Sequence, residues 1–365
     1  MSRGERPPAF DSVRGRATPE LHPVGWRERL KLTRPGPALA ALRRLRRVPG
    51  VALRAETAAA RDRLYGWRAP PPPRSRDVRS VACLLSGPAP VEPLLDSIEA
   101  VLASEGDACQ VVVVDDGSIA GRERVLRDRY PEVAVVRNRR PTGGPPNMWR
   151  QLRLGLEHSL ERFRFEIWFK LDTDALLVAP GAAKACLERL AAHPRAGIAG
   201  SYRVRADGKP EQGSYHAAVI AREIRHDRVL AAAIARATES GWAPGDVVQG
   251  GGLCLTRAAC EALRDQGWLA WPRPWSSLVY DDLALTAFTV AAGFQPVSLG
   301  DPAGLFAVGL SALPLAKEEI ADGPWVVTHS LKRGLAGETE AELRAYFRAR
   351  RAAWTTTGGQ PAASG

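Results

Sequence analysis

Two acidic residues, Asp172 and Asp174, lie between two apolar runs near the middle of the chain. In an extended segment, side chains two residues apart point to the same side and are about 6–7 Å apart. Two carboxylates so placed can share Mn²⁺ or Mg²⁺, which takes oxygen ligands and keeps positions open for phosphate oxygens. The alternative is a solvated turn that caps a helix, but the apolar flanks disfavour it because burying an unpaired carboxylate is costly. The spacing therefore predicts a metal site, with Lys170 as either a phosphate contact or a cation at a strand edge.

A second acidic pair, Asp115 and Asp116, follows a strongly β-branched run and precedes Gly117 and Ser118. In open α/β sheets, ligands bind at the carboxyl ends of the strands. A carboxylate there can accept hydrogen bonds from a ribose hydroxyl or a nucleobase N–H. These residue types also form ordinary turns and helix caps. The second acidic strand end downstream favours the nucleoside-binding interpretation.

A third acidic pair, Asp281 and Asp282, stands where a helix is predicted to begin. Adjacent carboxyls perturb each other's pKa, and a carboxylate with a raised pKa can deprotonate a hydroxyl as a general base. The alternative role is electrostatic, because acids favour the positive end of a helix. Trp271, shortly before this pair, is predicted either to stack on a sugar ring or to pack in the core.

Two further features could contribute to the same chemistry. Gly250, Gly251 and Gly252 precede a predicted strand and would let the backbone approach a ligand closely, or would form a tight turn or bulge. His329 follows a short apolar strand, and its imidazole could bind a transition metal, although a single histidine is more often packed or exposed. Lys332 lies three residues further on and could hold a diphosphate.

Short apolar strands alternate with helical patterns from residue 77 onward. Strands are predicted at 81–85, 110–115, 133–136 and 165–170, and helices at 93–103, 122–129 and 148–163. This alternation predicts an α/β, doubly wound, mostly parallel sheet covered on both faces. The second half is mixed, with strands predicted at 197–202, 216–220, 250–256 and 325–329, and helices at 223–240, 257–266, 281–293 and 338–353.

The charge is concentrated at the N-terminal end of the 365-residue chain. Residues 1–75 contain 16 Arg and 1 Lys against 6 acidic residues, and the whole chain has a net charge of +11, so the remainder is close to neutral. A helical run at 37–48 and a polyproline spacer at 70–73 lie in this part. The basic segment predicts peripheral contact with an anionic membrane or a protein through residues 37–48, or disorder; nucleic-acid binding is not expected.

The cysteines and the apolar runs bear on the cellular compartment. Five cysteines, an odd number without CxxC spacing, argue against a disulfide framework or a zinc site and favour a reducing environment. No run reaches the roughly 18 apolar residues of a membrane-spanning helix, and the first residues lack the apolar core of a signal peptide. A cytoplasmic protein, or one peripheral to the inner face of the membrane, is expected.

Residues 111–118 and 172–174 resemble the nucleotide and metal motifs of GT-A glycosyltransferases. Residues 168–174, 250–256 and 280–283 are similar to the β-1,3-galactosyltransferase and fringe-like group, whereas 114–118 is more like the large inverting family 2 that includes cellulose and chitin synthases. The resemblance covers roughly residues 80–330. The Tyr-Asn pair that usually follows the family's first strand is replaced by residues 86–90.

The resemblance implies a metal-dependent, inverting hexosyltransferase that uses a nucleotide-sugar donor, with UDP as the expected nucleotide. The acceptor would be a glycan, a lipid-linked group or a protein. The implied metal ligands are Asp172, Asp174 and His329, the implied base is Asp282 beside Asp281, and the implied donor contacts are Asp115, Asp116, Ser86, Lys170, Gly251, Gly252 and Lys332.

The domain organisation follows from these patterns. We expect a basic extension at 1–76, a GT-A domain at 77–353 and a loose tail at 354–365; within the domain, 77–178 would bind nucleotide and 179–353 the acceptor. One alternative is a nucleotidyltransferase, which would need a glycine-rich basic signature after the first strand, where residues 86–90 carry no base. Another is a non-catalytic GT-A-like binding module with a basic docking arm.

Overall fold

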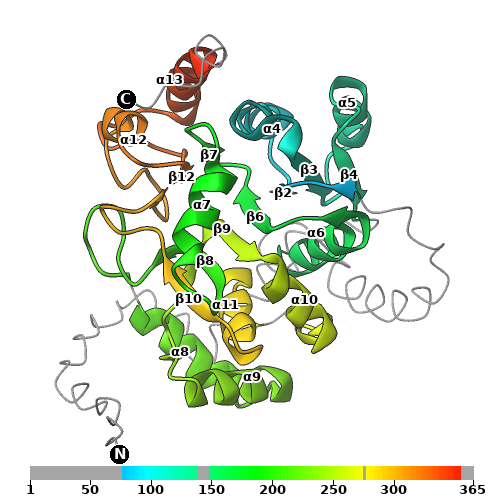
Figure 1. Cartoon of the computed structure of the whole chain (residues 1–365), viewed down its shortest axis with the longest axis vertical. Coiled ribbons are helices and arrows are strands. Elements are labelled where there is room, and N and C mark those ends of the chain that lie inside the picture. Colours follow the sequence, from blue (N-terminus) through cyan, green and yellow to red (C-terminus); the bar gives the residue numbers. More distant parts are fainter. Residues whose placement is uncertain (1–75, 139–147, 212, 274–276, 355–365) are drawn as a thin grey trace, which may run out of the picture.

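The computed structural model describes residues 76–138, 148–211, 213–273 and 277–354 (Figure 1). The helical run predicted at 37–48, the polyproline spacer and the loose tail lie outside these residues. Within them, the strand and helix alternation predicted for the first half is present, with the helix at 122–129 matching α5 (Arg122–Arg129) at both ends.

A seven-stranded sheet forms the centre of the molecule (Figure 1). Four of its six strand pairings are parallel, and β9 runs antiparallel to both of its neighbours. Residues 77–178 and residues 179–353 both contribute strands, so the two predicted halves share one continuous sheet. The strand order is β10 (Gln295–Ser298), β8 (Ala196–Tyr202), β9 (Val248–Thr256), β6 (Ile167–Asp172), β2 (Ser80–Ser86), β3 (Cys109–Asp115) and β4 (Ala134–Arg137).

Helices cover both faces of this sheet, which is why most residues of its interior strands are apolar and buried. Alternate residues of β2 enter different cores: Val81 and Cys83 pack on one face, and Ala82 and Leu84 on the other. The first face is covered by α6 (Met148–Arg162), α9 (Arg228–Glu239), α10 (Arg257–Asp265) and α11 (Asp281–Ala291), and the second by α4 (Val91–Glu105), α5 and α7 (Ala182–Ala191).

A small second sheet lies beside the main one. It contains β11 (Phe306–Val308), β12 (Val327–His329) and the two-residue strand β7 (Leu176–Leu177), which begins two residues after Asp174. Helices α12 (Lys317–Asp322) and α13 (Glu340–Ala352) pack against this sheet around a third core cluster. The remaining short elements are β1 (Arg76–Asp77), which pairs with β5 (Phe163–Arg164), and the 3-10 helices η2 (Gly106–Ala108) and η4 (Trp268–Ala270).

Two predictions in the second half are wrong. The segment 216–220 is not a strand but part of helix α8 (Gly213–Glu223); its only buried residues, Val219 and Ile220, pack into the core on the first face of the main sheet. The next helix begins at Arg228 and not at residue 223, because Asp227 caps it by accepting a hydrogen bond from the Leu230 amide at 2.9 Å.

The predictions about cysteines and membrane segments can also be compared with the structure. All five cysteines are buried free thiols. Among the described helices, none has both the length and the hydropathy needed to cross a bilayer.

Candidate active site

Asp172, Asp174 and His329 come together at the carboxyl end of β6. One ligand atom from each residue lies within 4.8 Å of the others. Nε2 of His329 is 3.3 Å from Oδ2 of Asp174. The histidine reaches this point because β12 pairs with β7, the strand that directly follows the acidic motif, with Thr328 opposite Leu176.

The second nitrogen of His329 fixes the role of the ring. Nδ1 lies 2.7 Å from the carbonyl oxygen of Gly309, which can only accept a hydrogen bond, so Nδ1 carries the proton. In the neutral form of the ring the lone pair is therefore on Nε2, on the side of Asp174. Metal-binding histidines are usually oriented in this way by a partner on the other nitrogen.

The donor set fits a Mn²⁺-type ion. Two carboxylates and one imidazole nitrogen suit a borderline cation that also accepts water or phosphate oxygens. The side chains of Asp174 and His329 are 13% and 9% exposed, and that of Asp172 is 21% exposed, so the group is sheltered but reachable. Burial raises the pKa of Asp172, with the Lys170 charge opposing it; for Asp174 burial is outweighed by His329, Lys332 and Ser330, which hold its pKa well below the usual range.

One of the two predictions for Lys170, a cation at a strand edge, is wrong. Lys170 lies in the interior strand β6 with a fully buried side chain, and its Nζ is 2.7 Å from Asp172 and 3.3 Å from Asp281. It also donates a hydrogen bond to the Gly250 carbonyl. In the structure its partners are thus these carboxylates and a carbonyl oxygen, and it links the metal-ligand motif to the acidic pair at α11.

The two acids at the start of α11 have different surroundings. Asp281 is buried and paired with Lys170, whereas Asp282 is partly exposed and accepts hydrogen bonds from the amides of Gly250 at 3.2 Å and Leu283 at 2.7 Å. Burial and the neighbouring Asp281 charge raise the pKa of Asp282 to about 6, against the opposing charge of Lys170. Asp282 is therefore the one suited to exchange a proton near neutral pH.

The glycine run forms a bulge in β9. Gly200 of β8 pairs with Leu253, but Tyr202, two residues on, pairs with Val248, five residues away on β9. A Cβ on Gly251 would overlap the His329 ring, and one on Gly250 would lie 2.8 Å from the Asp282 Cβ. Glycine is needed here because the backbone passes directly against the His329 ring and the Asp282 side chain.

Replacing Gly251 by alanine tests this close approach. We expect Gly251→Ala to lower the free energy of unfolding by about 1–3 kcal/mol, as overpacking does, and to weaken Mn²⁺ binding because the His329 ring must move. In a His329→Ala background, where the methyl group has space, the same substitution should cost much less. Thermal or denaturant unfolding of the four proteins measures this coupling; equal losses in both backgrounds would contradict it.

The predicted nucleoside residues are held together by an arginine that the sequence did not single out. Arg122 is 2% exposed; its Nη1 lies 2.6 Å from Oγ of Ser86 and 3.2 Å from Oδ1 of Asp115, and also donates to the Gly87 carbonyl. Oδ2 of Asp116 is buried without a hydrogen-bond partner in the structure. Arg122 thus ties the ends of β2 and β3 together, and one carboxylate oxygen of Asp116 has unused acceptor capacity.

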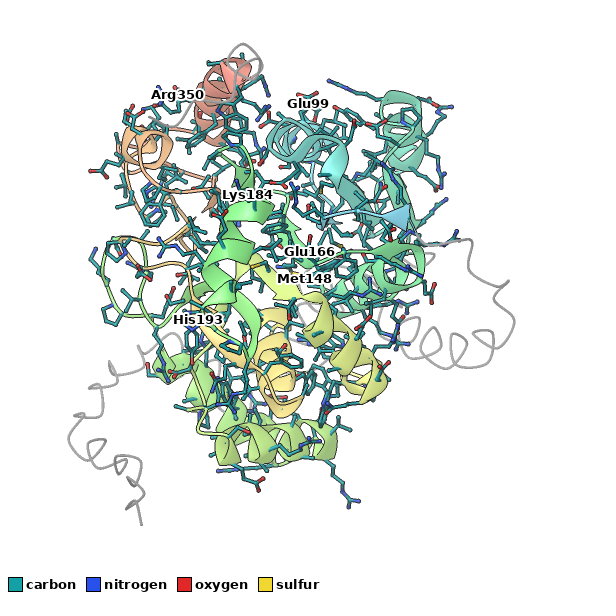
Figure 2. The ribbon with its side chains drawn as sticks, viewed as in Figure 1. Glu99, Met148, Glu166, Lys184, His193 and Arg350 are labelled. Atoms are coloured by element: carbon teal, nitrogen blue, oxygen red, sulfur yellow. The ribbon has the colours of Figure 1, made fainter. Side chains whose placement is uncertain are left out.

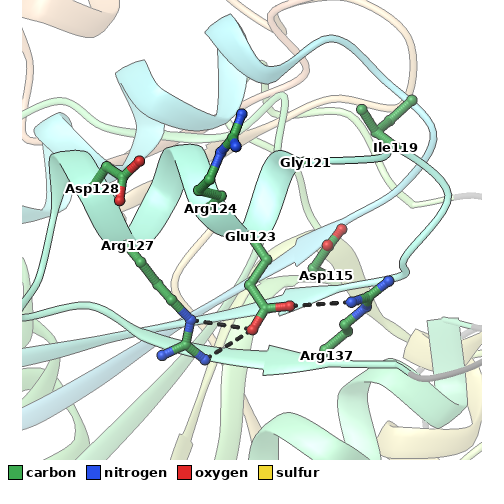
Figure 3. Close-up of a pocket in the computed structure, with 8 residues that line it drawn as sticks. All are labelled: Asp115, Ile119, Gly121, Glu123, Arg124, Arg127, Asp128 and Arg137. Atoms are coloured by element: carbon green, nitrogen blue, oxygen red, sulfur yellow. Dashed lines mark hydrogen bonds and ion pairs between the residues drawn. The ribbon is translucent and has the colours of Figure 1, made fainter.

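A cavity of about 330 Å³ adjoins Asp115 from the side of α5 and β4 (Figure 3). Glu123 lies between Arg127 at 3.0 Å and Arg137 at 3.5 Å, so part of the basic lining is already paired. The cavity is lined by Asp115, Ile119, Gly121, Glu123, Arg124, Arg127, Asp128 and Arg137.

Two other residues singled out in the sequence, Lys332 and Trp271, differ in their exposure to solvent. Nζ of Lys332 is 3.0 Å from Asp174 and its side chain is 61% exposed, so it lies beside the cluster and is open to solvent. Trp271 is 3% exposed, packs edge-on against Trp149 and Phe288, and donates a hydrogen bond to Asp227 at 2.7 Å. Of its two predicted roles, the structure shows core packing.

No protein-family model matches the chain, and no curated protein sequence matches it. Among solved structures, a mannosyltransferase from Pyrobaculum calidifontis in complex with GDP-Man and Mn²⁺ is similar over 85% of this chain and 76% of its own length, with 17% sequence identity and a TM-score of 0.40. A likeness at this level does not by itself define a fold or an activity. The chemistry of the site follows from its own side chains.

Proposed function

We propose that this chain is a metal-dependent glycosyltransferase of the GT-A type, which transfers a hexosyl group from a nucleotide sugar, with UDP as the expected nucleotide, to an acceptor hydroxyl with inversion. The observation that carries the proposal is the joining of two groups through Lys170: the Asp172, Asp174 and His329 cluster on one side and the Asp281 and Asp282 pair on the other. Metal ligands beside a carboxyl with a raised pKa suit displacement of a diphosphate leaving group.

In this proposal the donor is bound by its nucleoside and its diphosphate. Asp116, whose Oδ2 has no hydrogen-bond partner in the structure, would accept a hydrogen bond from the nucleoside, with Asp115 and Ser86 holding the local backbone through Arg122. Mn²⁺ or Mg²⁺ on Asp172, Asp174 and His329 would supply charge neutralisation to the departing diphosphate. Lys332 would add a second positive charge there.

Asp282 would act as the base. It takes the proton of the acceptor hydroxyl as the oxygen attacks the anomeric carbon, and the bond from that carbon to the diphosphate oxygen breaks with its electron pair on the nucleoside diphosphate. Attack from the face opposite the leaving group inverts the configuration. Gly250 and Gly251 would form the wall beside this point, since their backbone already contacts Asp282 and lies against the His329 ring.

The wider organisation is part of the same proposal. Residues 77–353 would form the catalytic unit, with 77–178 binding the donor and 179–353 shaping the acceptor site for a glycan, a lipid-linked group or a protein. Residues 1–76 would be a basic arm that contacts an anionic membrane or a protein, and the enzyme would lie in the cytoplasm or at the inner face of the membrane.

The proposal is tested by hydrolysis of a panel of UDP- and GDP-sugars with Mn²⁺, with Mg²⁺ and with excess EDTA. We expect at least one donor to be hydrolysed to the nucleoside diphosphate, and EDTA to abolish the reaction. Release of pyrophosphate from nucleoside triphosphates instead would support the nucleotidyltransferase. The absence of both hydrolysis and any shift in melting temperature with donor plus Mn²⁺ would contradict an enzyme and favour a binding module.

A further inference from the structure

The carboxyl-terminal helix α13 reaches the metal-ligand turn. The side chain of Arg344 is 6% exposed, and its Nη2 donates a hydrogen bond of 2.5 Å to the carbonyl oxygen of Thr173, the residue between Asp172 and Asp174. Arg344 and Thr173 are 171 residues apart in the sequence. In Figure 1, α13 lies next to α4 and close to two strands of the small sheet, β7 and β12. Strand β7 follows the acidic motif, and β12 ends at His329.

Arg344 is held in place by other groups on both helices. Its Nη1 lies 3.0 Å from Oδ2 of Asp96 on α4, and its Nε lies 2.9 Å from Glu340, one turn earlier on α13. All three guanidinium nitrogens therefore have acceptors. A planar donor group fixed in this way can hold a carbonyl oxygen in one position more firmly than a flexible lysine could.

Asp96 is shared with two more arginines of α13. Arg351 lies 2.7 Å and Arg348 3.3 Å from Oδ1 of Asp96, which is 2% exposed. Figure 2 shows the labelled Glu99 of α4 and Arg350 of α13 on these two neighbouring helices. Among these three arginines, only Arg344 contacts both Asp96 and the Thr173 carbonyl. Substitutions at Arg344 and at Arg351 can therefore distinguish the packing of α13 on α4 from the contact with the turn.

We propose that Arg344 is a positioning residue for the metal site. By fixing the Thr173 carbonyl, it sets the backbone between Asp172 and Asp174, so that both carboxylates point to the His329 side of the turn. Ser97, whose Oγ lies 3.2 Å from the Thr173 carbonyl and 3.1 Å from that of Ala175, supports the same turn from α4. This inference rests on the proposed function, since it concerns the metal that the turn would bind.

The test compares Arg344→Met with Arg351→Met. Both substitutions remove a buried arginine of α13 and leave Asp96 with two others, but only the first removes a contact with the turn. We expect Arg344→Met to raise the Mn²⁺ dissociation constant, measured from the electron paramagnetic resonance of free Mn²⁺, by about tenfold or more, as loss of an outer partner of a metal ligand does. Arg351→Met should bind Mn²⁺ as the unsubstituted protein does, although both variants should melt at lower temperature.

A second readout needs no metal. The amide of Ala175 donates to the Asp172 carbonyl at 3.0 Å across the turn, and its hydrogen exchange in metal-free protein should be faster in Arg344→Met than in Arg351→Met. Equal Mn²⁺ constants and equal exchange rates in the two variants would overturn the inference. If the unsubstituted protein does not bind Mn²⁺, the proposed metal site fails, and the exchange rates alone decide the role of Arg344. Should a methionine variant not fold, Arg344→Lys and Arg351→Lys take its place under the same criteria.

Discussion

Substitution of Asp282 by asparagine is expected to reduce glycosyl transfer by about 10²–10⁴-fold, the usual contribution of a general base. Asparagine keeps the size of the side chain and an oxygen that can accept from the Gly250 amide, but it cannot take the acceptor proton. Mn²⁺ affinity and melting temperature should remain close to those of the unsubstituted protein. Initial rates at saturating donor measure the effect.

A matched control is Asp265→Asn, which removes an acid that is 62% exposed at the end of α10 and should leave the rate unchanged. A rate loss of less than about tenfold in Asp282→Asn would exclude Asp282 as the base. A large loss accompanied by lost Mn²⁺ binding would instead indicate that the substitution had disturbed the metal site.

The pH dependence of transfer should follow Asp282. Its pKa is raised to about 6 by burial and by the Asp281 charge, against Lys170, and the base must be deprotonated to act. The rate should therefore fall by about tenfold per pH unit below 6 and level off above it. Mn²⁺ binding measured over the same range separates this limb from loss of the metal, and the limb should be absent in the residual activity of Asp282→Asn.

The second large effect is expected for Asp174. Asp174→Asn should raise the Mn²⁺ dissociation constant by more than about 100-fold, because even outer partners of metal ligands contribute about 10–100-fold. Transfer should be lost in parallel and should recover partly at high Mn²⁺ concentration. Titration with Mn²⁺, followed by the resonance of the free ion, gives the constant.

Ser330→Ala is the graded control for this variant. The hydroxyl of Ser330 lies 2.8 Å from Oδ2 of Asp174 and orients the carboxylate without being one of the predicted ligands. We expect about a tenfold loss of Mn²⁺ affinity. If Asp174→Asn bound Mn²⁺ as tightly as Ser330→Ala, the carboxylate would not be a metal ligand.

Local patterns were sufficient for six of the seven strands of the main sheet; they did not predict β10, a strand of four residues. The β-branched run of β3 and the apolar run of β6 read as strands because both faces of these strands are covered by helices. The same rule failed for α8, whose few buried residues give no clear period, and it passed over β7, which is only two residues long and too short to show any. Nothing in the local sequence of β7 indicates that it pairs with β12.

The sequence by itself determined the chemical types at the site: paired acids at two strand ends and at a helix start, a glycine run, and a histidine after an apolar strand. Only the tertiary structure decided which of these residues come together and how each is surrounded. Pairing of β7 with β12 brings His329 to Asp174. The buried Lys170 forms an ion pair with Asp281, whereas the pKa of Asp282 is raised. Arg122 and Arg344 were not recognisable beforehand, because an arginine on a charged helix shows its partner only after distant segments pack and exclude water.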